Sequence, residues 1–195
     1  HEKGIRCLTL TWNGVNLLGY ASDTSQDEGL TPFGKDIVKR INGLNMIADV
    51  SHINEKGFYD VAELCNKPFI ASHSNSKALC SHVRNLTDDQ FKVIIEKNGV
   101  AGINIFPEFL SEDGNGTIED IVRHIDHFME LGGENHIGIG SDFDGVCELP
   151  WGIEGNADLY KIFNELSIRG YTKEQIDKIS FKNFERVFKD VIERA

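Results

Sequence analysis

The chain has 195 residues, of which 40% are hydrophobic and 26% charged, and this balance supports one globular domain over residues 1–195. Its formal net charge of -11 disfavours a nucleic-acid partner and an anionic membrane surface. No run of about 20 apolar residues occurs, so no membrane-spanning segment is predicted.

Four cysteines occur without any Cys-x-x-Cys pair, which disfavours a structural zinc knuckle and favours free thiols in a reducing, cytoplasmic compartment. The chain opens on His1 and shows no signal-peptide pattern. An opening without Met predicts a domain that is truncated at its N-terminus and has lost any targeting information encoded there.

Short apolar runs alternate with helix-like segments along the whole chain. Strands are expected at about 5–11, 46–50, 69–72, 100–105 and 136–139. Four helices should begin at the capping residues Thr31, Asn54, Thr87 and Thr117 and end near 44, 65, 97 and 131. A helical tail is expected at 157–168, 172–179 and 181–193, and residues 13–28 read as a long loop.

The strand runs are continuously apolar, which indicates buried parallel strands with helices outside. About five β-α units are therefore predicted. A complete β/α barrel needs eight units and about 250 residues, so the pattern suggests the carboxyl-terminal portion of a TIM-type barrel. An open five-stranded α/β sheet is the alternative.

Two of the strand runs end in Ser-His, at His52 and His73. Because the carboxyl ends of neighbouring parallel strands meet at one edge of a sheet, we expect the two imidazoles to lie close together. Such a pair can bind one metal ion and leave the open coordination that a catalytic zinc needs. In the alternative interpretation, each histidine only donates to a nearby carbonyl.

Three further residues could join the histidines. Arg84 lies in the loop after the second of these strands, where a guanidinium could bind a carboxylate through two hydrogen bonds or form a surface ion pair. Asp142 and Asp144 follow the last strand. A carboxylate there could bind metal, transfer a proton, hold an ammonium group or cap a helix.

Other patterns are weaker. Gly29 to Lys35 matches a phosphate-binding loop, but Asp36 stands where Ser or Thr should follow and Pro32 lacks an N–H, so nucleotide binding is not expected. His124 and His127 share a mid-helix face and are expected at the surface or as supporting residues behind a site. His82 and His136 belong to no pattern.

Taken together, these segments resemble the membrane (renal) dipeptidase family of zinc peptidases, in its bacterial form. The resemblance covers nearly the whole chain and is carried by residues 8–11, 29–34, 49–52, 71–80, 84–88, 138–145 and 183–188. It implies a β/α barrel that holds two zinc ions and hydrolyses dipeptides, and a homodimer is possible.

The resemblance also implies roles for individual residues. It implies that His52 and His73 bind one zinc, that Arg84 holds the terminal carboxylate of the substrate, and that Asp142 binds the substrate amino group and serves the leaving amine. Trp12 occupies the position of a substrate-binding histidine that contacts the scissile carbonyl in many members.

In the family, the other zinc uses a His-x-Asp pair and a bridging Glu that precede the opening strand, so this chain should hold half of the metal site. The resemblance therefore favours a zinc dipeptidase but leaves alternatives. One is an inactive barrel fragment or non-catalytic ligand-binding relative, and another is a metal-dependent amidohydrolase of a different substrate class, such as a lactamase.

Overall fold

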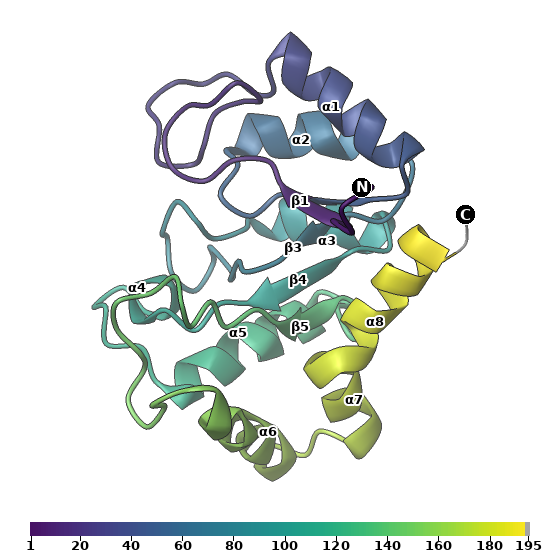
Figure 1. Ribbon diagram of the computed structural model, residues 1–195. Coiled ribbons are helices and arrows are strands. Elements are labelled where there is room, and N and C mark those ends of the chain that lie inside the picture. Colours follow the sequence, from purple (N-terminus) through teal and green to yellow (C-terminus); the bar gives the residue numbers. More distant parts are fainter. Residues whose placement is uncertain (194–195) are drawn as a thin grey trace.

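The computed structural model describes residues 1–193 (Figure 1). The strands are β1 (Cys7–Thr9), β2 (Ile47–Asp49), β3 (Ile70–Ala71), β4 (Val100–Ile103) and β5 (Ile137–Ile139). The α-helices are α1 (Pro32–Gly43), α2 (Glu55–Leu64), α3 (Asp88–Glu96), α4 (Pro107–Leu110), α5 (Ile118–Glu130), α6 (Leu159–Ile168), α7 (Lys173–Asp177) and α8 (Asn183–Phe188). A 3-10 turn, η1 (Asn156–Asp158), precedes α6, and two π-helical segments, η2 (Lys178–Lys182) and η3 (Lys189–Glu193), flank α8.

The five strands form one parallel sheet in the order β1-β2-β3-β4-β5. Each strand therefore pairs with the next one in the chain, and each crossover between them carries at least one helix. This sequential order is the order of a β/α barrel, since a doubly wound sheet reverses direction part-way across. The predicted parallel α/β architecture of about five units is confirmed.

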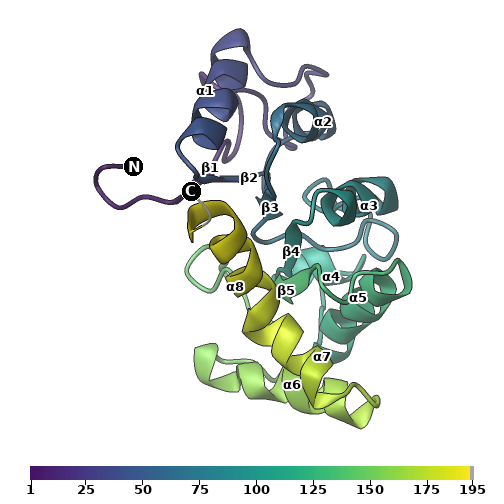
Figure 2. The same cartoon turned by 90° about the vertical axis from the view of Figure 1, so that its right-hand side faces the viewer.

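Both faces of the sheet are buried, which explains why the strand sequences are continuously apolar. Ala48, Ala71 and Ala101 belong to the main core beneath the outer helices, whereas the preceding residue of each strand belongs to a second core with Val187 and Val191. This alternation follows the two-residue repeat of a strand. Figure 2 shows α2, α3 and α5 along one side of the sheet and α8 along the other.

The predicted helix starts are confirmed, and each has a local cause. The side chains of Thr31 and Asn54 accept hydrogen bonds from the backbone N–H groups three residues ahead. Thr87 and Thr117 form complete capping boxes with the side chains at N3. These caps satisfy backbone donors that have no partner inside the helix.

The strands are shorter than predicted, and Asp49 accounts for the end of β3. Its carboxylate accepts from both the backbone N–H and the hydroxyl of Ser72, which removes Ser72 from the sheet ladder. The segment that follows β5 also approaches this strand end closely, because a Cβ added at Gly140 would lie 1.9 Å from the carbonyl oxygen of Ser72. The strand ends therefore give way to polar contacts at the edge where the site lies.

Two expectations about helices need correction. The segments 172–179 and 181–193 run as one succession from α7 to η3, in which π-helical segments replace the expected break. The short helix α4 was not predicted at all. The four cysteines form no disulfide, and no helix within residues 1–193 combines the length and apolar character needed to cross a membrane.

His124 is neither at the surface nor behind a metal ligand. It is fully buried, its Nδ1 accepts from the backbone N–H of Ser76 at 3.1 Å, and its Nε2 lies 3.0 Å from the carbonyl oxygen of Leu110. The surface alternative was wrong because α5 packs its polar-looking face against the loops after β3 and β4. The imidazole serves there as a hydrogen-bonded core residue.

Candidate metal and substrate site

The two strand-end histidines converge. His52 follows β2 and His73 follows β3, and their Nε2 atoms are 2.9 Å apart, with the rings edge-to-face at a centroid distance of 4.9 Å. Neighbouring parallel strands place them at the same edge of the sheet. The structure thus brings together the two residues that the sequence selected as metal ligands.

A chain of polar contacts orients His73. The hydroxyl of Ser72 donates to Asp49 at 2.6 Å, so its oxygen is left to accept from Nδ1 of His73 at 2.7 Å. The backbone N–H of His73 donates to the hydroxyl of Ser51 at 2.9 Å. A protonated Nδ1 leaves the lone pair on Nε2 facing His52, which is the tautomer that a metal ligand needs.

His52 is held mainly through its backbone. Its φ of 73° lies in the left-handed region, and its carbonyl accepts from the N–H of Ser22 at 2.7 Å. Its Nδ1 lies 3.3 Å from Oδ1 of Asn13, which can accept the Nδ1 proton. The loop over residues 13–28 therefore contacts this histidine on two sides.

Burial keeps both imidazoles neutral near pH 7. Burial lowers the pKa of His52 to about 3, with smaller contributions from the positive charge of Arg84 and from His73. Burial and Arg84 also lower the pKa of His73, against the opposing effect of Asp142 and Asp49. Neutral imidazole is the form that binds a metal, so this pair of nitrogen donors fits a divalent ion such as zinc.

Arg84 is a buried cation at the wall of the site, with 7% of its surface exposed. Its Nη2 donates to the carbonyl of His73 at 3.4 Å, and its guanidinium lies 5.6 Å from the centre of the Phe109 ring. Burial lowers its pKa to about 10, although Asp49, Asp142 and Asp23 oppose this shift. Arg84 therefore stays charged at neutral pH and is not a surface ion pair.

Asp142 reaches the same place from β5. Its Oδ2 lies 3.9 Å from Nε2 of His73 and accepts from the side-chain amide of Asn104 at 3.4 Å. Its φ of 59° is also left-handed. Asp144 does not line the cavity that Asp142 faces, so the structure favours Asp142 of the two candidates.

These residues share a cavity of about 880 Å³, within the size range of small-molecule sites. Trp12, which is 73% exposed, stands on its rim. Phe106 and Phe109 form an aromatic wall, and the ring of His82 packs on Phe109 with centroids 4.4 Å apart. No local sequence pattern predicts this wall, because its members come from separate segments, the loop after β3 and the segment around α4.

Asp49 supports the site from below, and the sequence patterns did not single it out as a candidate site residue. It is 2% exposed and accepts hydrogen bonds from Thr9, Ser51 and Ser72, so it joins three strand ends beneath the site. A carboxylate inside an otherwise apolar strand run was the available signal. Within residues 1–193, no group of three or more His, Cys, Asp or Glu side chains forms a metal-binding cluster.

A parallel sheet in sequential order, with paired histidines and a buried arginine at its carboxyl edge, is typical of metal-dependent hydrolases built on a β/α barrel. The family model of the membrane dipeptidases, peptidase family M19, matches residues 1–195. The chain belongs to this family, whose solved members include enzymes described as metallo peptidases, and membership implies a bound metal.

The matches between this chain and two similar proteins cover different shares of those proteins. An uncharacterized protein of Klebsiella pneumoniae is 39% identical over 98% of this chain and 74% of its own length. An uncharacterized dipeptidase of Schizosaccharomyces pombe is 34% identical over 97% of this chain and 47% of its own.

Two solved structures superpose on the chain with TM-scores of 0.92. A metallo peptidase from Rhodobacter sphaeroides, liganded with a phosphinate mimic of the dipeptide L-Ala-D-Ala, is 35% identical and is covered over 57% of its length. The probable dipeptidase PvdM from Pseudomonas aeruginosa is 26% identical and is covered over 64%. This chain thus spans somewhat more than half of the solved relatives.

Proposed function

We propose that this chain carries the substrate-recognition part and one metal half-site of a zinc dipeptidase. The observation that carries the proposal is the convergence of His52 and His73 at 2.9 Å in a cavity that also contains a buried, charged Arg84 and Asp142. Neutral imidazoles would hold one zinc ion. The second zinc expected from the family resemblance has no cluster of ligands among residues 1–193.

A bound zinc would supply Lewis-acid polarisation of the scissile carbonyl and of the attacking water. The side chains supply the rest. Arg84 would bind the terminal carboxylate of the dipeptide, because its charge is buried and its planar donors match a carboxylate. Asp142 would bind the substrate ammonium and pass a proton to the leaving amine, while Trp12 would cover the opening of the cavity.

This arrangement would select dipeptides over longer peptides. One fixed positive group and one fixed negative group bind the two charged ends of a substrate of a single length. A longer peptide would leave Arg84, which is buried, or Asp142, which is half-buried, without its charged partner, and an unpaired buried charge is costly. A phosphinate mimic of L-Ala-D-Ala bound to the Rhodobacter relative supports this substrate class.

The test combines metal content with hydrolysis. We expect the purified full-length protein to contain zinc by elemental analysis and to hydrolyse alanine dipeptides of defined stereochemistry but not the tripeptide. His52→Ala and His73→Ala should each lose zinc, whereas His127→Ala, on α5 and paired with Asp88, should retain it. Zinc content that is unchanged in both variants would refute the metal assignment.

Activity and metal content answer separate questions. A full-length protein that binds zinc through these histidines but cleaves no dipeptide would refute the catalytic proposal and favour a non-catalytic relative. Cleavage of a β-lactam or another amide without cleavage of dipeptides would favour the amidohydrolase alternative. Homodimer formation and a cytoplasmic location are proposed from the sequence, and sedimentation and cell fractionation test them.

A further inference from the structure

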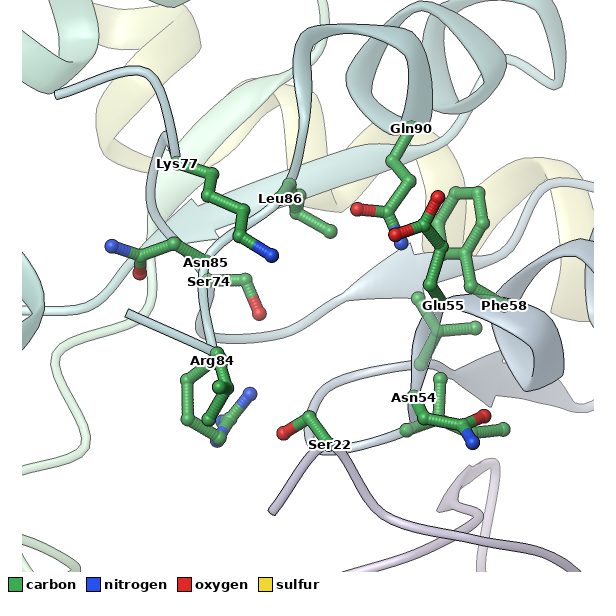
Figure 3. Close-up of a pocket in the computed structure, with 13 residues that line it drawn as sticks. Ser22, Asn54, Glu55, Phe58, Ser74, Lys77, Arg84, Asn85, Leu86 and Gln90 are labelled. Atoms are coloured by element: carbon green, nitrogen blue, oxygen red, sulfur yellow. The ribbon is translucent and has the colours of Figure 1, made fainter. Parts of the chain in front are cut away.

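A second, smaller cavity lies behind Arg84. It has a volume of about 150 Å³ and shares only Val83 and Arg84 with the large cavity of the site. Figure 3 shows Ser22, Asn85 and Arg84 around it, together with the polar side chains of Lys77 and Gln90. The guanidinium of Arg84 therefore lies between the proposed substrate site and this second, partly open chamber.

Three buried polar atoms on the wall of this chamber have no hydrogen-bond partner among residues 1–193. They are the Nε of Arg84, the Oδ1 of Asn85 and the Oγ of Ser22. Arg84 and Asn85 are 7% and 4% exposed, so bulk solvent does not satisfy them. Leaving such a group unpaired costs about 1–3 kcal/mol, and more for a charged one. Three of them around one cavity indicate a polar occupant.

The chamber has the properties of a hydrated cavity. A water molecule takes up about 30 Å³ in the liquid, so 150 Å³ accommodates a few of them. A water molecule placed here can accept from Nε of Arg84 and donate to Oγ of Ser22. Side chains of both charge signs line the chamber, Glu55 as well as Lys77, and this mixed lining favours neutral water over an ion.

Arg84 depends on such support. Within residues 1–193, the only hydrogen bond of its guanidinium is the long one to the carbonyl of His73, and the guanidinium also lies near the ring of Phe109. Ser22 connects the chamber to the metal site, because its N–H donates to the carbonyl of His52 while its hydroxyl faces the chamber. One loop residue thus contacts both halves of the site.

We propose that ordered water fills this chamber and bridges Ser22 Oγ to Nε of Arg84. Ser22 is then a positioning residue that fixes the guanidinium for binding a substrate carboxylate. The water bridge stands on the geometry alone, whereas its effect on substrate binding rests on the proposed dipeptidase function.

The water bridge is tested by crystallography at a resolution that shows ordered water. We expect density within about 2.7–3.2 Å of both Arg84 Nε and Ser22 Oγ. In Ser22→Ala, a small change that removes only the hydroxyl, the guanidinium should shift or occupy more than one conformation. An empty chamber, an ion in place of water, or an unmoved guanidinium in Ser22→Ala would each overturn the proposal.

The kinetic test separates positioning from general destabilisation. Ser22→Ala should raise KM for an alanine dipeptide about three- to tenfold with kcat changed less than twofold, and Ser22→Thr, which keeps a hydroxyl, should restore KM. Ser25→Ala, on the exposed part of the same loop, is the matched control and should change neither constant. A fall in kcat with unchanged KM, or an equal effect of Ser25→Ala, would contradict the positioning role.

The two proposals fail in different ways. If the unaltered protein cleaves no dipeptide, the proposed function fails, and the crystal structures of the unaltered protein and of Ser22→Ala still decide whether water supports Arg84. If the unaltered protein is active and the chamber is dry, the inference fails while the function stands.

Discussion

His52 and Asp142 share a left-handed backbone conformation, with φ values of 73° and 59°. A residue with a Cβ adopts this region at a cost of about 1–3 kcal/mol, so the conformation persists only where its surroundings enforce it. Here the carbonyl of His52 is held by Ser22, and the carbonyl of Asp142 by Gly145. In both cases the chain turns immediately after a strand, so that the side chain faces the cavity. The backbone strain is consistent with a functional site at this edge.

At the residue scale, the first prediction concerns Arg84. Arg84→Ala should raise KM for a dipeptide about 10- to 100-fold with a smaller effect on kcat, because a charge-assisted contact of about 1.5–3 kcal/mol to the substrate carboxylate is lost. Arg84→Lys keeps the charge but not the planar pair of donors, so its KM should lie between those of the unaltered protein and Arg84→Ala. Steady-state kinetics check this, and an unchanged KM in a folded Arg84→Ala protein would refute the role.

The second residue-scale prediction concerns Asp142. Asp142→Asn keeps the size of the side chain and removes its charge, so kcat/KM for dipeptides should fall at least 100-fold while zinc content stays nearly unchanged. Kinetics and elemental analysis on the same preparation check both parts. Asp144→Asn is the control, since Asp144 does not line the cavity. Full activity in Asp142→Asn would make the carboxylate a structural residue.

At the element scale, His124 connects α5 to the loops that carry the site. Its Nδ1 accepts from the backbone N–H of Ser76 in the loop after β3. Its Nε2–H donates to the backbone carbonyl of Leu110 at the end of α4. This pattern requires the neutral imidazole, because a proton on Nδ1 would face the N–H of Ser76. Burial accordingly lowers the pKa of His124 to about 4.

The third prediction follows from this pKa. Between pH 6.5 and about 4 the unfolded chain takes up a proton at His124 and the folded chain does not, so stability is lost as the pH falls through this window. The full effect is about 3 kcal/mol. Urea unfolding at pH 7 and pH 4.5 should show a smaller loss of stability on acidification in His124→Gln than in the unaltered protein.

The control for the third prediction is on the same helix. His127 lies three residues after His124 on α5. Its half-buried side chain pairs with Asp88. His127→Gln should leave the contribution of His124 in place, so its stability should still fall with acidification through the window assigned to His124. An identical pH dependence in His124→Gln and the unaltered protein would show that His124 does not carry the effect.

At the scale of the whole molecule, α8 completes the burial of the sheet. Val187 is fully buried against Ile47, Ile70 and Val100 in the second core. Arg186 reinforces this contact by donating to the carbonyls of Asn98 and Asn135. Helices on the opposite face alone would leave a row of β-branched side chains exposed, so the C-terminal segment is required for the fold that presents the site.

The fourth prediction tests that contact. Val187→Ala should lower the free energy of unfolding by about 2 kcal/mol, from lost apolar burial and the cavity that remains. Val15→Ala, the same change at a position that is 54% exposed, should cost less than about 0.5 kcal/mol. Denaturant unfolding measures both, and equal effects at the two positions would contradict the assigned packing.

The sequence by itself determined the elements and the residues to consider. Continuous apolar runs and capping side chains act over a few neighbouring positions, so the five strands and the starts of four helices could be predicted, as could the strand-end placement of His52 and His73. The family resemblance added the dipeptidase class. These features are either local or follow one another in a fixed order along the chain, so they can be recognised without knowing how the elements pack.

Only the tertiary structure decided how those residues meet. The contact between His52 and His73, the hub at Asp49 and the burial of His124 depend on side chains that lie about 20 to 50 residues apart in sequence. The position of Arg84 between two cavities likewise depends on a loop that no periodic pattern specifies. Backbone turns and packing between elements set these distances, and neither leaves a signature in neighbouring residues.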